Sequence, residues 1–219
     1  MRRNENNGMS ERMPTRPILR YFGGKWMLAP WIIKHFPAHR IYVEPFGGAA
    51  SVLMRKPRAY SEVYNDLDGE IVNVFRVLQD AGTRTQLEQL VRLTPFARRE
   101  FELSYEPADD PVEHARRKIF RSMAGFGSDA LQATWTTGFR GNAQRSGTMP
   151  AHNWATYPEQ LRAFGARLAG VVIECVEAER LIEMHDTPET LFYCDPPYVW
   201  HTRANRRDWR RDDTNILGS

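Results

Sequence analysis

The sequence has no long apolar run and no apolar segment near its N-terminus. Its 219 residues are 42% hydrophobic and 26% charged, which is ordinary for a globular protein. None of the apolar stretches approaches the roughly 18 residues that a membrane span requires. Residues 1–16 are polar and lack the apolar core of a secretory signal. We therefore expect a disordered leader at 1–16 and a cytoplasmic protein with no membrane partner.

Cysteine is also scarce. The two cysteines, Cys175 and Cys194, each fall in a predicted buried strand, so we expect reduced core thiols rather than a disulfide. The six histidines are scattered without the spacing of metal ligands, and we predict no metal. The length allows one large or two small domains. A net charge of +3 is compatible with a polyanionic partner but does not require one.

Strand and helix patterns alternate at both ends of the chain. Residues 41–53 predict a strand, a glycine turn and the start of a helix. Further strands are predicted at 60–64, 171–176 and 190–194, and helices at 112–123, 158–168 and 178–184. Residues 81–168 break the alternation. The pattern therefore predicts an α/β domain made of 17–80 and 169–219, with a mostly helical insertion at 81–168.

The stretch 191–198 places a carboxylate and an aromatic ring directly after a short, apolar predicted strand. Pro196 and Pro197 cannot extend a central strand, because they lack N–H groups and their φ is fixed. Ligands of open α/β sheets bind at the carboxyl ends of the strands. The Asp195 carboxylate and the Pro196 carbonyl could accept both hydrogens of an exocyclic amino group while Tyr198 stacks on its ring. The alternative is a proline turn that Asp195 caps.

A second carboxylate follows the predicted strand 60–64. Asp66 is placed to accept hydrogen bonds from ribose hydroxyls. Alternatively, Asp66 or Asp68 caps the next helix, and both readings hold together if Asp68 is the cap and Asp66 faces the ligand. The paired glycines at 23–24 and 47–48 would let a bulky ligand lie against the backbone.

The segment 125–149 is polar and rich in glycine, and it is too long for a simple connection. Its basic and amide side chains, interleaved with aromatic ones, suit contacts with phosphates and base edges. Between residues 112 and 147 there are six Lys and Arg against two acidic residues. A solvated basic face is the alternative. The candidate nucleic-acid contacts are Arg116, Arg117, Arg121, Arg140, Asn142 and Arg145.

Four motifs in this order resemble the Dam-like adenine-specific DNA methyltransferases that are common in phages and prophages. They are Tyr-Phe-Gly-Gly-Lys at 21–25, Glu-Pro-Phe-Gly-Gly-Ala-Ala-Ser at 44–51, Tyr-Asn-Asp at 64–66 and Asp-Pro-Pro-Tyr at 195–198. The resemblance runs from about residue 17 to the end of the chain. It implies a Rossmann-like S-adenosylmethionine-dependent methyltransferase sheet with an inserted target-recognition domain at 81–168.

The same resemblance implies the reaction and the site. The methyl donor would be S-adenosylmethionine, and the substrate would be N6 of a flipped adenine in double-stranded DNA, bound by a monomer in a bacterial or phage-infected cell. The residues implied at the cofactor are Tyr21, Lys25, Phe46, Gly47, Gly48, Ser51, Asp66, Glu177 and Asp195. The residues implied at the adenine are Asp195, Pro196, Pro197 and Tyr198. Glu177 departs from the Asp that family members usually carry after the strand at 171–176.

A second departure is the length of the chain, which ends 21 residues after Tyr198. Relatives continue with strands that complete the sheet, so we expect a truncated chain whose C-terminal strands are missing. Two other functions stay open. One is a catalytically inactive DNA-binding remnant. The other is a protein methyltransferase acting on a glutamine amide, against which the basic, aromatic insertion argues.

Overall fold

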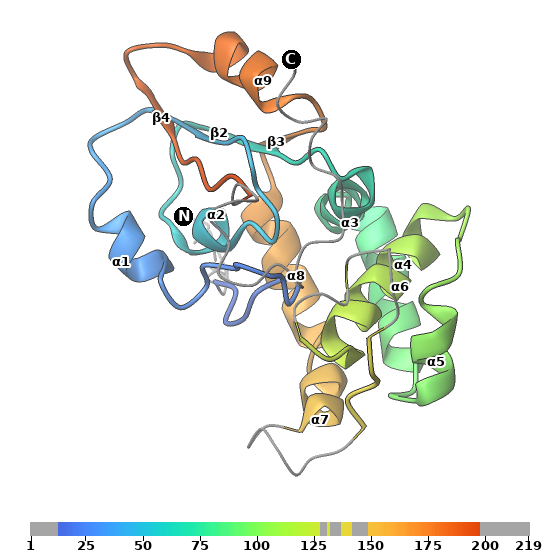
Figure 1. The fold of residues 1–219 in the computed structure, drawn as a ribbon. Helices are drawn as coiled ribbons and strands as arrows, with labels where there is room; N and C mark the ends of the chain where they lie inside the picture. The colour runs from blue at the N-terminus through green and yellow to red at the C-terminus, as the bar shows by residue number, and fades with distance from the viewer. Residues whose placement is uncertain (1–12, 128–130, 132–136, 142–148, 198–219) are drawn as a thin grey trace, which may run out of the picture.

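The computed structural model describes residues 13–127, 131, 137–141 and 149–197 (Figure 1). Strands and helices alternate near both ends of this part of the chain, as the sequence predicted. The elements in chain order are α1 (Ala29–Ile33), β1 (Ile41–Glu44), α2 (Ser51–Arg55), β2 (Ser61–Asn65), α3 (Gly69–Gln79), α4 (Ala81–Leu93), α5 (Arg98–Leu103), α6 (Pro111–Ala124), α7 (Pro150–Ala155), α8 (Pro158–Leu168), β3 (Val171–Glu174), α9 (Ala178–His185) and β4 (Thr190–Phe192).

The four strands form one parallel sheet in the order β3-β2-β1-β4. In the register, Val43 of β1 lies opposite Val63 of β2 and Phe192 of β4. A parallel sheet with helical crossovers is the α/β class that the sequence predicted. In Figure 1, α9 lies on one side of the sheet, and α3 and α8 lie on the other.

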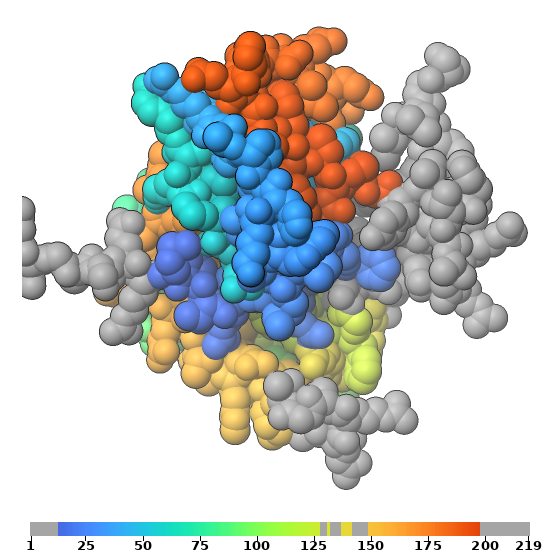
Figure 2. Space-filling model, turned by 90° about the vertical axis from the view of Figure 1, so that its left-hand side faces the viewer, coloured from blue at the N-terminus to red at the C-terminus, as the bar shows by residue number. Residues whose placement is uncertain are grey.

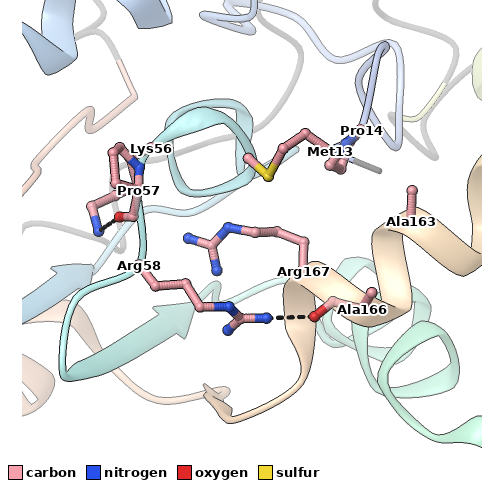
Figure 3. A pocket seen from close by; sticks show the side chains of 8 residues that line it. All are labelled: Met13, Pro14, Lys56, Pro57, Arg58, Ala163, Ala166 and Arg167. Carbon is pink, nitrogen blue, oxygen red and sulfur yellow. Dashed lines mark hydrogen bonds between the residues drawn. The ribbon is translucent and has the colours of Figure 1, made fainter. Parts of the chain in front are cut away.

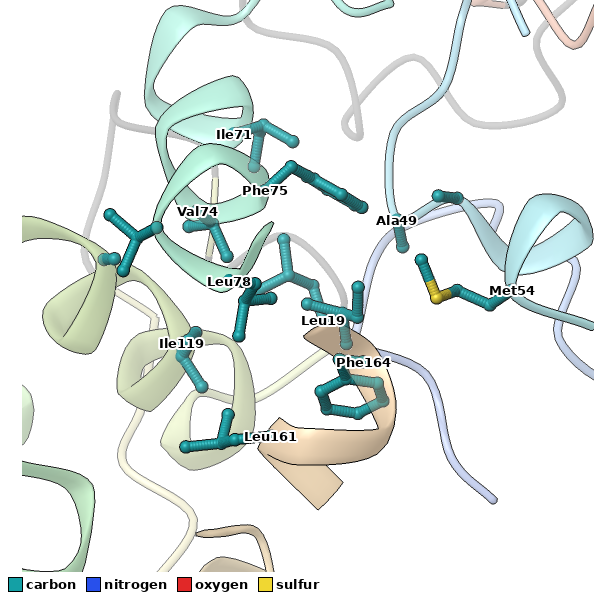
Figure 4. Close-up of a cluster of buried hydrophobic side chains, with 14 of the residues drawn as sticks. Leu19, Ala49, Met54, Ile71, Val74, Phe75, Leu78, Ile119, Leu161 and Phe164 are labelled. Carbon is teal, nitrogen blue, oxygen red and sulfur yellow. The ribbon is translucent and has the colours of Figure 1, made fainter. Parts of the chain in front are cut away.

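Alternating residues of the strands face two different cores. Tyr42 and Tyr64 are fully buried in the larger core, where the Tyr64 ring stacks on Phe75 of α3 with 4.1 Å between centroids. Val43 and Val63 point to the other face and meet Leu181 of α9 in a small cluster. The larger core therefore holds most of the buried apolar surface, and in Figure 4 side chains of α3, α6 and α8 meet Ala49 and Met54 in it.

The helical segment 81–168 shares this larger core. α8 has the predicted bounds and packs against α2, α3 and α4, while α6 packs against α3 and α4. Ile119 of α6 and Leu161 of α8 lie close to Val74 and Leu78 of α3 (Figure 4). The division of the chain at residues 80 and 168 stays a prediction, but the two parts do not have separate cores.

Two expectations about the ends of the chain need correction. Within the predicted leader, Thr15 and Arg16 are tied to the helical region, Thr15 to Gln160 and Arg16 to Thr156. Residues 1–12 lie outside the described residues. The strand β4 is shorter than predicted and only half-buried, because within the described residues it pairs with β1 alone.

The cysteines are not in the buried strands where we expected them. β3 ends before Cys175, which is half-buried, and β4 ends before Cys194, which is exposed. Neither cysteine forms a disulfide. Among the described residues, no helix is long and apolar enough to cross a membrane, and no group of three His, Cys, Asp or Glu side chains could hold a metal ion.

Candidate active site

Three carboxylates lie at or just after the carboxyl ends of the neighbouring strands β2, β1 and β4. Glu44 is the last residue of β1, Asp66 directly follows β2, and Asp195 lies three residues after β4. The strands are parallel, so their carboxyl ends lie together, where open α/β sheets bind ligands. That Asp66 and Asp195 both follow the carboxyl ends of strands is expected from the parallel order of the strands.

Asp66 holds the glycine turn that follows β1. Its Oδ2 accepts the Gly48 N–H at 2.8 Å, and its Oδ1 accepts the Asp68 N–H at 2.8 Å. Burial raises the pKa of Asp66, although these backbone hydrogen bonds oppose the rise. Asp68 caps α3 by accepting the Glu70 N–H at 2.9 Å. The prediction that Asp68 caps α3 is therefore confirmed. The contact of Asp66 with a ribose stays a prediction.

The glycine turn is closely packed by the protein's own rings. A Cβ on Gly47 would lie 2.2 Å from Tyr64 Cε2, so only glycine fits beside that ring. Gly48 has a φ of +49°, and a Cβ there would lie 3.0 Å from Tyr21 Cε1. Gly47 is thus needed for packing inside the protein, and its contact with a cofactor stays a prediction. The contact of Gly48 with Tyr21 brings the first motif onto the second motif.

Glu44 belongs to the second motif, and the structure gives it a role that its sequence context does not reveal. It is 2% exposed, and its Oε1 accepts the Leu53 N–H at 2.8 Å and the Tyr42 hydroxyl at 2.6 Å. The first bond satisfies an N–H in the first turn of α2, which Ala50 at the N-cap position cannot do. Burial raises the pKa of Glu44 to about 7, even though both hydrogen bonds favour its charged form.

Lys25 and Asp195 form an ion pair between the first and last motifs, with 2.7 Å between Nζ and Oδ2. Lys25 Nζ also donates to the Gly23 carbonyl at 2.7 Å. The two side chains are 20% and 30% exposed, so the pair is reachable from solvent. On the surface, the segment around α1 lies directly beside the C-terminal residues near β4 (Figure 2). The sequence predicted both residues at one site but not their contact.

The other predicted cofactor residues have varied surroundings. Ser51 Oγ, at the start of α2, is buried with no hydrogen-bond partner. Phe46 is half-buried in the glycine turn. Glu177 is exposed before α9 and makes no capping hydrogen bond. Pro196 and Pro197 are exposed beside Asp195, and Tyr198 lies outside the described residues.

The arginines of α6 do not form the free basic face that we expected. Arg116 is 5% exposed and pairs with Glu113 at 2.6 Å and Glu100 at 3.0 Å. Arg117 binds Glu113 at 2.7 Å and the carbonyls of Glu106 and Pro107. The position of Glu113 three and four residues before these arginines was a signal for pairing along one helix. Because Arg116 is buried and neutralised, we do not propose it as a DNA contact, and Arg117 is mostly engaged in the same way.

Arg121 and Arg140 lie where the 125–149 segment leaves α6. Arg121 is 6% exposed, its Nη2 lies 3.8 Å from Glu70 Oε2, and its guanidinium lies 5.0 Å from the centroid of the Tyr105 ring, so we do not propose it as a DNA contact. Arg140 is half-buried, and its Nη1 donates to the Met123 carbonyl at 3.5 Å. Asn142 and Arg145 lie outside the described residues.

A pocket lies far from these carboxylates, at the end of the sheet where β2 begins (Figure 3). Its walls are apolar apart from Lys56, Arg58 and Arg167. Lys56 and Arg167 both pair with the buried Glu62, at 2.7 Å and 2.6 Å. Arg58 donates to carbonyls at the end of α8. Arg58 and Arg167 therefore hold α8 to β2 and the segment before it, and Lys56 is neutralised by the same Glu62.

Comparison with known proteins gives the same family as the motifs. Residues 21–216 match the family model of the D12 class N6 adenine-specific DNA methyltransferases. The chain is 26% identical over 214 residues to a DNA adenine methylase of Haemophilus influenzae, covering 91% of this chain and 69% of that protein. DNA adenine methylases of Escherichia coli K12 and Vibrio cholerae are 24% and 25% identical over 193 residues, with 84% of this chain and 65% of each of those proteins covered. The chain thus spans about two thirds of the length of these curated relatives.

Proposed function

Because this chain belongs to the family of the D12 class N6 adenine-specific DNA methyltransferases, we propose that it transfers a methyl group from S-adenosylmethionine to N6 of an adenine in duplex DNA. The observation that carries the proposal is that contacts link residues of all four motifs near the carboxyl ends of the strands. Lys25 pairs with Asp195, Asp66 holds Gly48, and the ring of Tyr21 covers Gly48.

The chain offers a suitable place for the methyl donor beside the glycine turn. Ser51 Oγ is a buried polar atom without a partner, as expected of a group that awaits a ligand. Tyr21 packs on Gly48 of the same turn, and the Asp66 carboxylate accepts the Gly48 N–H. We propose that Tyr21, Ser51 and Asp66 hold S-adenosylmethionine, which supplies an activated methyl group when bound.

Asp195 would orient the adenine. The amino nitrogen of adenine is a poor nucleophile because its lone pair is delocalised into the ring. Hydrogen bonds from that nitrogen to the Asp195 carboxylate and the Pro196 carbonyl would favour a pyramidal amine with its lone pair directed at the methyl group. The carboxylate would also stabilise the positive charge that develops on the nitrogen, before the extra proton leaves to solvent. Lys25 would fix the direction of the Asp195 carboxylate through their 2.7 Å contact.

The adenine must leave the base stack to reach Asp195, at a cost of a few kcal/mol. We propose that Tyr198 stacks on the extruded ring, and that Arg140, Asn142 and Arg145 contact the DNA. Arg140→Ala should weaken binding to duplex DNA and reduce the slope of log affinity against log salt by about 1, as measured by filter binding over a salt series. Unchanged affinity and slope would place the DNA elsewhere on the protein.

The test of the catalytic assignment is transfer of labelled methyl from S-adenosylmethionine to unmethylated duplex DNA, with the product nucleoside identified by chromatography. We expect N6-methyladenine from the wild type. Asp195→Ala should lower the rate by about 100-fold or more, as for other groups that stabilise a developing charge. Asp186→Ala, which alters an exposed aspartate after α9, is the matched control.

The outcomes separate the alternatives. Transfer that survives Asp195→Ala would remove the proposed role of this carboxylate. Binding of S-adenosylmethionine and DNA by the wild type without any transfer would favour the inactive DNA-binding protein. Label on a protein glutamine in place of adenine would replace the proposed substrate.

A further inference from the structure

Asn65, the last residue of β2, ties together the segments that follow three neighbouring strands. It is 1% exposed, and β2 lies between β1 and β3 in the sheet. On one side, Asn65 Nδ2 donates to the carbonyl of Pro45, which follows β1, at 2.9 Å. On the other side, Nδ2 donates to the Val176 carbonyl at 3.0 Å and Oδ1 accepts the Val176 N–H at 2.9 Å. Both hydrogens of the amide are therefore used.

The main chain at the same position holds the glycine turn. The Asn65 carbonyl accepts the Gly47 N–H at 2.7 Å, and the next residue, Asp66, accepts the Gly48 N–H at 2.8 Å. The glycine turn and the segment after β3 are thus fixed to one strand end. The side chain that does this must donate twice and accept once, which an aspartate or an apolar residue of the same size cannot do.

A carboxylate follows each residue of the Asn65–Val176 pair. They are Asp66 and Glu177, and both are among the residues that the motifs predict at the cofactor. Glu177 is exposed and caps no N–H of α9, so its carboxylate is available to a ligand. Because Val176 is held at its N–H and at its carbonyl, the backbone that carries Glu177 can move only by breaking hydrogen bonds to a buried amide.

We propose that Asn65 is a positioning residue that holds Glu177 in place relative to the glycine turn, so that the Glu177 carboxylate accepts a hydrogen bond from the amino group of the cofactor's adenine. This inference rests on the proposed function and adds to it a residue that selects the purine. A carboxylate can only accept, and a site built to bond an amino group rejects an analogue that lacks it.

The test compares the affinities for S-adenosylhomocysteine and S-inosylhomocysteine, in which an oxygen replaces the amino group of adenine, by isothermal titration calorimetry. The ratio of the two dissociation constants is the purine selectivity. We expect the wild type to prefer the adenine compound by about tenfold or more, as for a hydrogen bond to a charged group. Asn65→Ala and Glu177→Gln should each reduce this ratio by about threefold or more. A general loosening of the fold would weaken both ligands alike and leave the ratio unchanged.

The double variant tests whether Asn65 acts through Glu177. If it does, Asn65→Ala combined with Glu177→Gln should have the selectivity of Glu177→Gln alone, because the second change has nothing left to disturb. A further loss of selectivity in the double variant would show another route and overturn the inference.

A second substitution guards against a failure of Asn65→Ala to fold. Asn65→Asp keeps the shape of the side chain and the acceptor for the Val176 N–H, but its carboxylate repels the carbonyls of Pro45 and Val176. We expect this variant to lose selectivity as well. Wild-type selectivity in either variant at position 65 would overturn the inference.

Gln79→Ala is the matched control. Gln79 is also an amide that holds backbone beside β3, but at the opposite end of the strand, where its Nε2 donates to the carbonyls of Leu168 and Val171 at 2.9 Å and 2.6 Å. Its loss should lower the stability and leave the purine selectivity at the wild-type value. An equal loss of selectivity in Gln79→Ala and Asn65→Ala would refute a specific role of Asn65.

The experiment also distinguishes the inference from the function beneath it. If the wild type methylates adenine in DNA but binds both compounds equally well, the inference fails and the proposed function stands. If the wild type binds neither compound and transfers no methyl group, both fail.

Discussion

Replacing Glu44 with glutamine is expected to stabilise the protein at pH 8 and to leave its stability nearly unchanged at pH 4. Glutamine reproduces the protonated side chain, since its Oε1 can still accept the Leu53 N–H and the Tyr42 hydroxyl. It removes only the charge. The variant therefore isolates the cost of holding an ionised carboxylate in the core beneath the glycine turn.

The magnitude follows from the pKa. Burial raises the pKa of Glu44 from 4.5 to about 7 in the folded protein. Between pH 4.5 and 7 the folded state thus holds a proton that the unfolded state has lost, so stability falls as the pH rises through this window. Each pKa unit corresponds to about 1.4 kcal/mol. At pH 8 the ionised Glu44 should cost the folded wild type about 3 kcal/mol, and Glu44→Gln should recover most of it.

The assay is urea unfolding, followed by tryptophan fluorescence, at intervals from pH 4 to pH 8. Glu62→Gln is a control from the same core. Burial tends to raise the pKa of Glu62, but hydrogen bonds from Arg167 and Lys56 outweigh that effect and lower it. Glu62→Gln should therefore destabilise the protein by a constant amount between pH 5 and pH 8. If the difference between Glu44→Gln and the wild type were equally constant, the argument for a costly buried charge at Glu44 would be refuted.

Two further substitutions test the packing of glycines, again by urea unfolding. Gly47→Ala should destabilise the protein by about 2 kcal/mol or more, because its Cβ would lie 2.2 Å from the buried Tyr64 ring; adding Tyr64→Leu should reduce that cost. Gly165→Ala should cost about 1 kcal/mol net, because displacing Arg84 from the last carbonyls of α3 outweighs the better helix propensity of alanine. Gly69→Ala, with nothing within 4 Å of its Cβ, should be nearly neutral. Equal stability of all three alanine variants would contradict both packing arguments.

Local pattern was enough to predict the elements that carry the site. The alternation of apolar residues placed β2 within one residue of its observed bounds, and helical spacing gave α8 its bounds. The placement of Asp66 and Asp195 at the carboxyl ends of the strands followed from the parallel βα order alone. These features depend on residues close together in sequence and on a general rule of sheet topology.

Features set by distant contacts could not be predicted in this way. The charge count of 112–147 gave a basic face, but Lys118 pairs with Glu70, 48 residues earlier. The pattern of 190–194 indicated a buried strand, but burial depends on whether a strand is central or at the edge, and within the described residues β4 is at the edge. The ion pair of Lys25 with Asp195 also joins residues far apart in the sequence, so local pattern did not predict it.

The surroundings of the three carboxylates explain why Asp195 is the one proposed to meet the adenine. Glu44 is fully enclosed and bound to Tyr42 and an α2 N–H, so no substrate can reach it. Asp66 uses both oxygens to hold backbone N–H groups, and its movement would release the glycine turn. Asp195 is 30% exposed and pairs with the side chain of Lys25, which is 20% exposed. Of these three, Asp195 can therefore turn toward an amino group without releasing a backbone N–H of the glycine turn or of α2, while Asp66 stays in place and uses its remaining lone pairs for the cofactor.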